Sequence, residues 1–235
     1  MTIAGFDTSM PVTAACVVRD DGCAFATPPP SPERLLGRPE HSAELLPELA
    51  DLLQQAEVDW NDIDALAVGI GPGTFTGLRI GVATARALAH ALGVGISPVS
   101  SLAALAAGLT AGGSEPARPL LPLIDARRQQ VFAALYRPGT VPELVWGPLA
   151  LGREDLLGRI ADLDPPPLAG GDWALESRPD LEAAGVIVPP ADSGLHSVNA
   201  LYVCRLAEAI PPVPPDGVTP TYVRLPDAEI NRNAG

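Results

Sequence analysis

The feature that most constrains the fold is a glycine-rich turn between two apolar segments. Residues 63–70 predict a buried strand, and residues 77–92 follow almost directly and predict a helix. Glycine permits backbone angles that other residues avoid and lets other atoms approach the main chain closely. The turn holds four of them, at Gly69, Gly71, Gly73 and Gly77. Because a helix start presents free N–H groups, the turn predicts either an anion or phosphate cradle or a tight strand-to-helix connection.

The charges exclude several kinds of function. The chain carries 28 acidic and 15 basic residues, for a net charge of -13, and this balance argues against tight, unaided binding to a nucleic-acid backbone. Any contact with RNA would need a basic partner. Every basic residue is arginine, and the sequence has no lysine. This excludes Schiff-base chemistry, a pyridoxal-phosphate site and the phosphate-binding lysine of a Walker loop.

The composition predicts a globular protein of the cytoplasm. Hydrophobic residues make up 47% of the chain, which is enough for a sizeable core. The three cysteines, Cys16, Cys23 and Cys204, form neither a CxxC pair nor an even set, as is typical of a reducing compartment. The acidic start and the short apolar runs lead us to expect no signal peptide and no membrane span.

Two stretches of the sequence follow the same plan. A short apolar strand over residues 3–7 ends at Asp7, and another over residues 120–124 ends at Asp125. Each is followed by a turn and a further strand, which indicates an internal duplication of α/β units. An aspartate at a strand end can hold a phosphate or a metal-bound water, or it can form a local Asx turn. Both interpretations stay open at the sequence level.

The duplication divides the chain into two predicted lobes, residues 1–110 and residues 111–235. The proline-rich stretch 27–32 predicts a surface loop. The tail 211–226 is also proline-rich, and we expect residues 220–224 to dock in an extended form.

Two helices in the first half carry patterns that suit close packing. The segment 41–56 has leucines on one face and acids on the other. The segment 77–92 places small residues four apart, which lets another helix come very close. That helix could belong to this chain or to a second subunit. His41 is a candidate ligand or acid/base group, with a cap or surface role as the alternative.

The string Gly71-Pro72-Gly73-Thr74-Phe75-Thr76-Gly77-Leu78-Arg79-Ile80-Gly81 closely resembles the signature of the bacterial TsaB (YeaZ) family. Serine commonly stands at the place of Thr74 in that family. Four further segments are also similar, at residues 6–9, 41–47, 100–106 and 125–127. The resemblance is dense over residues 3–136 and thin afterwards. A string of this length is far more specific than a lone GxGxxG.

The resemblance implies an actin-like (ASKHA, ribonuclease H-like) α/β fold with two duplicated lobes. It also implies a non-catalytic subunit of the machinery that installs N6-threonylcarbamoyladenosine (t6A) on ANN-decoding tRNAs. In that family TsaB pairs with its paralogue TsaD and the ATPase TsaE joins the pair, so metal and ATP are expected on the partners and no cofactor here. Alone, the chain is expected to form a homodimer; tRNA contact is indirect, and no membrane is involved.

The catalytic relatives hold their metal with a His-x-x-x-His element. Here His41, His90 and His196 are far apart in sequence, so we expect no metal site and no catalytic residue. We predict that one set of residues forms the partner interface: Leu45, Leu49, Leu52, Gly77, Gly81, Ala85 and Leu88. The alternative is that these stripes pack on the chain's own sheet. A second set is predicted to be a vestigial nucleotide or anion site: Asp7, Thr8, Ser9, Gly71, Gly73 and Asp125.

Two rival functions come from other classes. An actin-like small-molecule kinase or ATPase could use Asp7, Asp125 and the glycine turns, although the absence of lysine argues against it. A protease ranks last, because the sequence has no recognisable Ser-His-Asp or HExxH arrangement.

Overall fold

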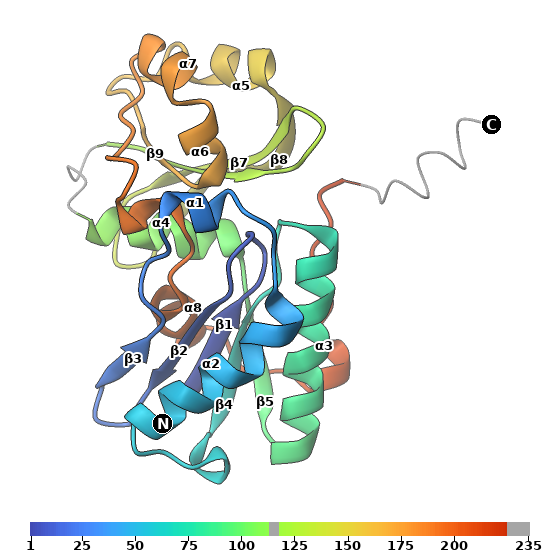
Figure 1. Ribbon diagram of the computed structural model, residues 1–235. Coiled ribbons are helices and arrows are strands. Elements are labelled where there is room, and N and C mark those ends of the chain that lie inside the picture. Colours follow the sequence, from blue (N-terminus) through green and yellow to red (C-terminus); the bar gives the residue numbers. More distant parts are fainter. Residues whose placement is uncertain (113–117, 225–235) are drawn as a thin grey trace.

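Two β-sheets, one in each lobe, form the frame of the molecule (Figure 1). The computed structural model describes residues 1–112 and 118–224. The first sheet has the strand order β3-β2-β1-β4-β5 and the second has the order β8-β7-β6-β9. The strands are β1 (Ile3–Asp7), β2 (Ala14–Val18), β3 (Ala24–Ala26), β4 (Ala65–Gly69), β5 (Gly95–Val99), β6 (Leu120–Asp125), β7 (Gln130–Arg137), β8 (Glu143–Gly152) and β9 (Leu168–Gly170).

The helices lie around and between these sheets. The α-helices are α1 (Pro32–Leu35), α2 (His41–Gln55), α3 (Phe75–Leu92), α4 (Ser101–Ala111), α5 (Arg153–Ile160), α6 (Asp172–Glu176), α7 (Arg178–Ala183) and α8 (Ala200–Ala207). The described residues also form the short 3-10 turns η1 (Trp60–Asp62), η2 (Gly194–His196) and η3 (Pro215–Gly217). Among the described helices, none combines the length and the apolar character that crossing a bilayer requires.

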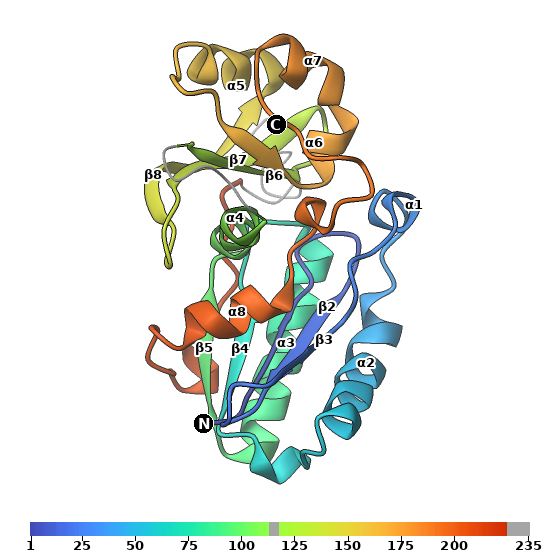
Figure 2. The same cartoon turned by 90° about the vertical axis from the view of Figure 1, so that its left-hand side faces the viewer.

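In the first lobe, helices cover both faces of the sheet. Figure 2 shows α2 and α3 on one face and α8 on the other. The leucine face of α2 and the small-residue face of α3 close one hydrophobic core over β1 and β4, with Phe6, Leu49 and Val68 fully buried. These α2 and α3 patterns, which the sequence predicted, therefore serve the internal packing of this lobe.

The second lobe repeats the start of the first. β1 pairs with β2 antiparallel and with β4 parallel, and β6 likewise pairs with β7 antiparallel and with β9 parallel. Asp7 and Asp125 occupy the last position of the first strand in their lobes. The strand-aspartate-hairpin plan read from the sequence is thus present twice. A single parallel bridge between Leu168 and Ile187 extends this second sheet.

The end of the described chain returns to the first lobe. α8 lies across β1 and β2 (Figure 2), and η3 lies against α3 (Figure 1). Burial of Val203 and Cys204 explains the return, because the apolar side of α8 covers the sheet face that α2 and α3 leave open. The sequence predicted one lobe for residues 111–235, whereas in the structure α8 and η3 pack against the first lobe.

Candidate functional site

The glycine turn and the end of β1 meet at Asp7. This side chain is 1% exposed, and its carboxylate accepts three hydrogen bonds from the protein itself. Oδ1 accepts from the Ser9 amide at 2.8 Å and from Ser9 Oγ at 2.5 Å. Oδ2 accepts from Ser101 Oγ at 2.5 Å. Hydrogen bonds to a charged acceptor are stronger than those between neutral groups. The turn between β1 and β2, through Ser9, and the first residue of α4, Ser101, therefore hold this buried carboxylate in place.

The glycine turn packs directly onto this network. A Cβ on Gly69 would overlap the Asp7 carboxylate, and one on Gly73 would overlap Ser9. The Thr74 amide donates to the Ser9 carbonyl at 2.8 Å, and the Gly71 amide donates to Ser101 Oγ at 3.1 Å. Two of the turn's N–H groups, those of Gly71 and Thr74, are therefore used inside the chain. Of the two interpretations of this turn, the geometry supports the close strand-to-helix connection.

Thr8 completes the contact between the turn and α3. Its Oγ1 donates to the Gly77 carbonyl at 2.8 Å. A Cβ on Gly77 would overlap the Thr8 carbonyl, and one on Gly81 would overlap Thr8 Oγ1. The glycines four apart thus bring α3 against the end of β1 in the same chain, which is the alternative that the sequence left open.

This placement corrects the role assigned to most of the predicted interface residues. Six of the seven are buried within the chain, whereas Leu88 is half-buried. The six are Leu45, Leu49, Leu52, Gly77, Gly81 and Ala85. They face the first sheet because their apolar or absent side chains fill the space between helix and strands. A partner contact on α2 and α3 has to use the other, exposed sides of these helices.

Asp125 belongs to a separate network in the second lobe. Its carboxylate accepts from the Arg127 amide at 2.7 Å and pairs with Arg127 Nη1 at 2.9 Å. Its own amide donates to Asp172 Oδ1 at 2.9 Å, and the Trp173 amide donates to the same oxygen at 2.9 Å. Asp7 and Asp125 thus lie in different lobes and use different partners, so the predicted vestigial site is two networks.

Asp172 is a central residue that the sequence reasoning missed. It is 3% exposed, and burial raises the pKa of its carboxyl to about 7. Its signal in the sequence is the Gly170-Gly171-Asp172 string, which by itself indicates only a turn. Ser101 was missed in a similar way, since paired serines before an apolar helix suggest only a cap.

An open depression of about 850 Å³ lies beside Asp125. Arg127, Arg128 and Gln129 line it from the β6–β7 hairpin, with φ angles of 60°, 54° and 60° in the left-handed region. Its other charged lining residues have both signs: Asp125, Arg153, Glu154, Asp155 and Glu176. Because acids outnumber arginines there, the depression is not a simple anion site.

His41 is buried rather than placed at the surface. It is 2% exposed, and its Nδ1 lies 3.0 Å from Thr13 Oγ1, which in turn donates to Glu44 Oε2 at 3.3 Å. Since one hydroxyl has one proton, Thr13 accepts from a protonated Nδ1. Burial lowers the pKa of His41. In the described parts of the chain, no three His, Cys, Asp or Glu side chains gather as metal ligands would.

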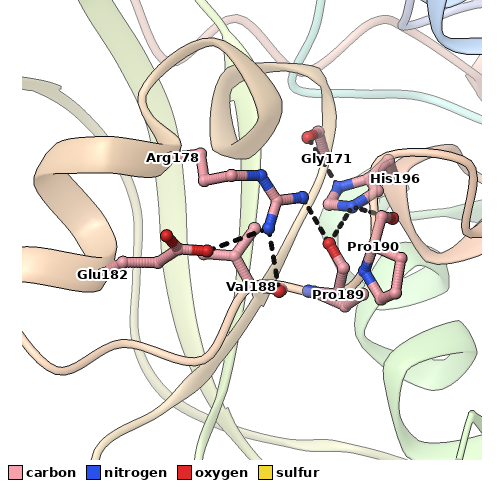
Figure 3. A network of polar contacts seen from close by, with 7 residues as sticks. All are labelled: Gly171, Arg178, Glu182, Val188, Pro189, Pro190 and His196. Atoms are coloured by element: carbon pink, nitrogen blue, oxygen red, sulfur yellow. Dashed lines mark hydrogen bonds and ion pairs between the residues drawn. The ribbon is translucent and has the colours of Figure 1, made fainter.

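A second buried histidine ties a loop to the second lobe (Figure 3). His196 Nδ1 lies 3.3 Å from the Gly171 carbonyl, and Nε2 lies 3.1 Å from the carbonyls of Pro189 and Pro190. Arg178 donates to the Val188 carbonyl at 3.1 Å and also to the Pro189 carbonyl. Two side chains therefore satisfy a run of loop carbonyls, which is a structural role.

Comparisons with known proteins agree with the resemblance. A family model described as "TsaD: tRNA N6-adenosine threonylcarbamoyltransferase" matches residues 36–143. An uncharacterized protein of Mycobacterium tuberculosis is 34% identical over 97% of this chain and 94% of its own length. The Bacillus subtilis tRNA threonylcarbamoyladenosine biosynthesis protein TsaB is 29% identical over 97% of this chain and 96% of its length. Its Escherichia coli counterpart is 40% identical over 42% of each chain.

The solved structure of YeaZ from Pseudomonas aeruginosa has the same fold. It superposes with a TM-score of 0.75 at 26% identity, covering 94% of this chain and 99% of that one. Together with the duplicated sheets, this match confirms the predicted actin-like α/β fold.

Proposed function

The chain belongs to the TsaB (YeaZ) family of tRNA t6A biosynthesis proteins, and we propose that it acts there as a non-catalytic scaffold. In this role it pairs with the paralogue TsaD, recruits the ATPase TsaE and forms a homodimer when alone. The complex works in the cytoplasm and modifies ANN-decoding tRNAs. Metal and ATP bind to the partners, and tRNA reaches this chain only through the complex.

One observation carries the non-catalytic part of the proposal. The Asp7 carboxylate is buried and bound by Ser9 and Ser101, and the glycine turn lies directly on it. A catalytic carboxylate needs access to substrate, metal or water. A phosphate cradle likewise needs free amides, and those of Gly71 and Thr74 already have acceptors within the chain.

We place the TsaD-binding surface on the outer sides of α2 and α3. The two helices lie next to each other on one face of the first sheet (Figure 2). Their exposed sides carry several small or apolar residues among the polar ones, and small residues permit close helix-to-helix contact. Leu46 is 48% exposed on α2, and Ala83 and Ala87 are exposed on α3 beside the half-buried Leu88.

A bulky charge on this surface tests the proposal. Ala87→Arg should weaken TsaD association at least tenfold in a titration followed by size-exclusion chromatography with light scattering, because an arginine would hold two closely packed helices apart. Ala183→Arg, on the exposed side of α7 in the other lobe, is the matched control. Wild-type affinity for the Ala87 variant would refute the surface. A wild-type chain that ignores both TsaD and TsaE would refute the scaffold function itself.

The open depression beside Asp125 favours one rival function. It leaves room for a ligand in the second lobe, as an actin-like small-molecule kinase or ATPase would need. Calorimetry with ATP and magnesium distinguishes this kinase or ATPase function from the scaffold function. Micromolar binding together with turnover by the isolated chain would establish the enzyme and overturn the scaffold-only role.

A further inference from the structure

The last described segment of the chain crosses from the first lobe to the second. Val218 is 1% exposed and anchors the segment in the core of the first lobe. Three residues later, the Thr221 amide donates to the Ile70 carbonyl at 2.8 Å. Arg224 then reaches the second lobe, where its Nη1 donates to the Ala126 carbonyl at 3.3 Å and to Gln130 Oε1 at 2.9 Å.

A stack of side chains fixes the middle of this segment to the start of α3. The rings of Tyr222 and Phe75 have centroids 5.2 Å apart. The Arg79 guanidinium lies 3.7 Å from the centroid of the Phe75 ring, and its Nε donates to Tyr222 Oη at 3.2 Å. Stacked aromatic rings with an arginine over one face attract each other beyond their shared apolar area. The stack therefore holds the segment in a set position.

The same segment covers the glycine turn. Gly71 has a φ of +106°, and a Cβ there would lie 3.1 Å from the Thr221 carbonyl oxygen. The tail backbone thus lies directly over the turn that packs on Asp7. At its other end, Arg224 binds the carbonyl of Ala126, the residue after Asp125. One short segment therefore touches the glycine turn of the first lobe and the strand-aspartate hairpin of the second.

We propose that residues 218–224 are an intramolecular clasp that sets the angle between the lobes and keeps the glycine turn covered. On the other side of the molecule, α4 joins the lobes through a shared apolar core with Leu105 and Leu120. That core would act as the hinge, and the clasp closes the opposite side (Figure 1). Segments held by exposed polar and stacking contacts are the ones that open locally without global unfolding, so the clasp is the part able to release.

The test measures the lobe separation and the protection of the clasp in the full chain. Spin labels at Gln54→Cys on α2 and Gly158→Cys on α5 report the distance between lobes, because both positions are exposed. The exposed Cys23 is replaced by serine, whereas Cys16 and Cys204 are buried. Pulsed electron paramagnetic resonance gives the distance distribution, and amide hydrogen exchange gives the protection of the Thr221 N–H.

Arg224→Ala should broaden the distance distribution and lower the protection of the Thr221 amide about tenfold, the effect of losing a charge-assisted hydrogen bond. Arg205→Ala, an exposed arginine on α8, is the control and should change neither. Tyr222→Ala should produce the same opening, and the double variant should add nothing, because either break opens the clasp. Unchanged distances and protection in Arg224→Ala, or fully additive effects in the double variant, would overturn the proposal.

Discussion

Removing one hydroxyl at Ser101 should destabilise the protein far more than removing its neighbour at Ser100. Ser101 Oγ donates to Asp7 Oδ2 at 2.5 Å and accepts from the Gly71 amide at 3.1 Å. It therefore connects β1, the glycine turn and α4 inside the first lobe. Ser100 Oγ accepts from the Ala103 amide at 3.3 Å and caps α4. The two substitutions remove the same atom from adjacent residues.

The magnitudes follow from what each change leaves unpaired. A hydrogen bond to a charged group contributes about 1.5–3 kcal/mol, and a buried donor without a partner costs a further 1–3 kcal/mol or so. Ser101→Ala loses the hydrogen bond to the Asp7 carboxylate and leaves the Gly71 amide without its acceptor, for a total of about 2.5–6 kcal/mol. Loss of a helix cap costs about 1 kcal/mol. We therefore expect Ser101→Ala to lose at least twice as much stability as Ser100→Ala.

Urea unfolding followed by circular dichroism measures both variants against the wild type. With a denaturant slope of about 3 kcal/mol per molar, Ser101→Ala should lower the urea midpoint by about 0.8–2 M and Ser100→Ala by about 0.3 M. Equal shifts for the two serines would refute the reasoning. That result would mean that the Asp7 carboxylate and the glycine turn do not depend on Ser101 for their burial.

Two further predictions test the same geometry elsewhere. Gly81→Val should destabilise the fold by about 2–3 kcal/mol in thermal unfolding, because the added Cβ would overlap Thr8 Oγ1. The control Ala83→Val, at an exposed position of the same helix, should cost under about 1 kcal/mol. Equal costs for the two variants would contradict the close contact of α3 with β1. Asp172→Asn should gain stability relative to the wild type as pH rises from 5 to 8. In the wild type the Asp172 carboxyl has a pKa of about 7 when folded and 3.8 when unfolded, so its protonated form stabilises the fold at low pH. This stabilisation, on the order of 3 kcal/mol between pH 5 and 8, is lost as pH rises through 7. Burial also raises the pKa of Glu48 to about 7, but Glu48 titrates in both proteins, so its effect cancels in the difference between their unfolding free energies. If that difference stayed constant between pH 5 and 8, Asp172 would not be held protonated.

Much of the local structure could be read from the sequence because it depends on short-range pattern. Alternating or continuous apolar runs ending in Asp7 and Asp125 predicted the strand ends of both lobes, and the structure has them there. The leucine spacing over residues 41–56 predicted α2 with its apolar face. The long glycine-rich string pointed to the family, and the comparisons agree.

The candidate site could be read only in part. The sequence placed Asp7 at a strand end and a glycine turn after another strand, but it offered two meanings for each. Deciding between them required knowing that Ser101 reaches Asp7 from 94 positions away. The same holds for Asp172, which touches Asp125 across 47 positions. Such long-range partners leave no periodic trace in the chain.

By itself, the sequence determined the strand ends at Asp7 and Asp125, the two long helices of the first lobe, the glycine turn and the family, because propensity, spacing and motif are local properties. Only the tertiary structure decided which way the helix faces point. The sequence predicted Gly77 and Gly81 as an intersubunit contact, with an internal contact as the alternative, and their contact with Thr8 makes them internal. The glycine turn packs closely for a similar physical reason: the amides of Gly71 and Thr74 and the Asp7 carboxylate find their partners within the fold.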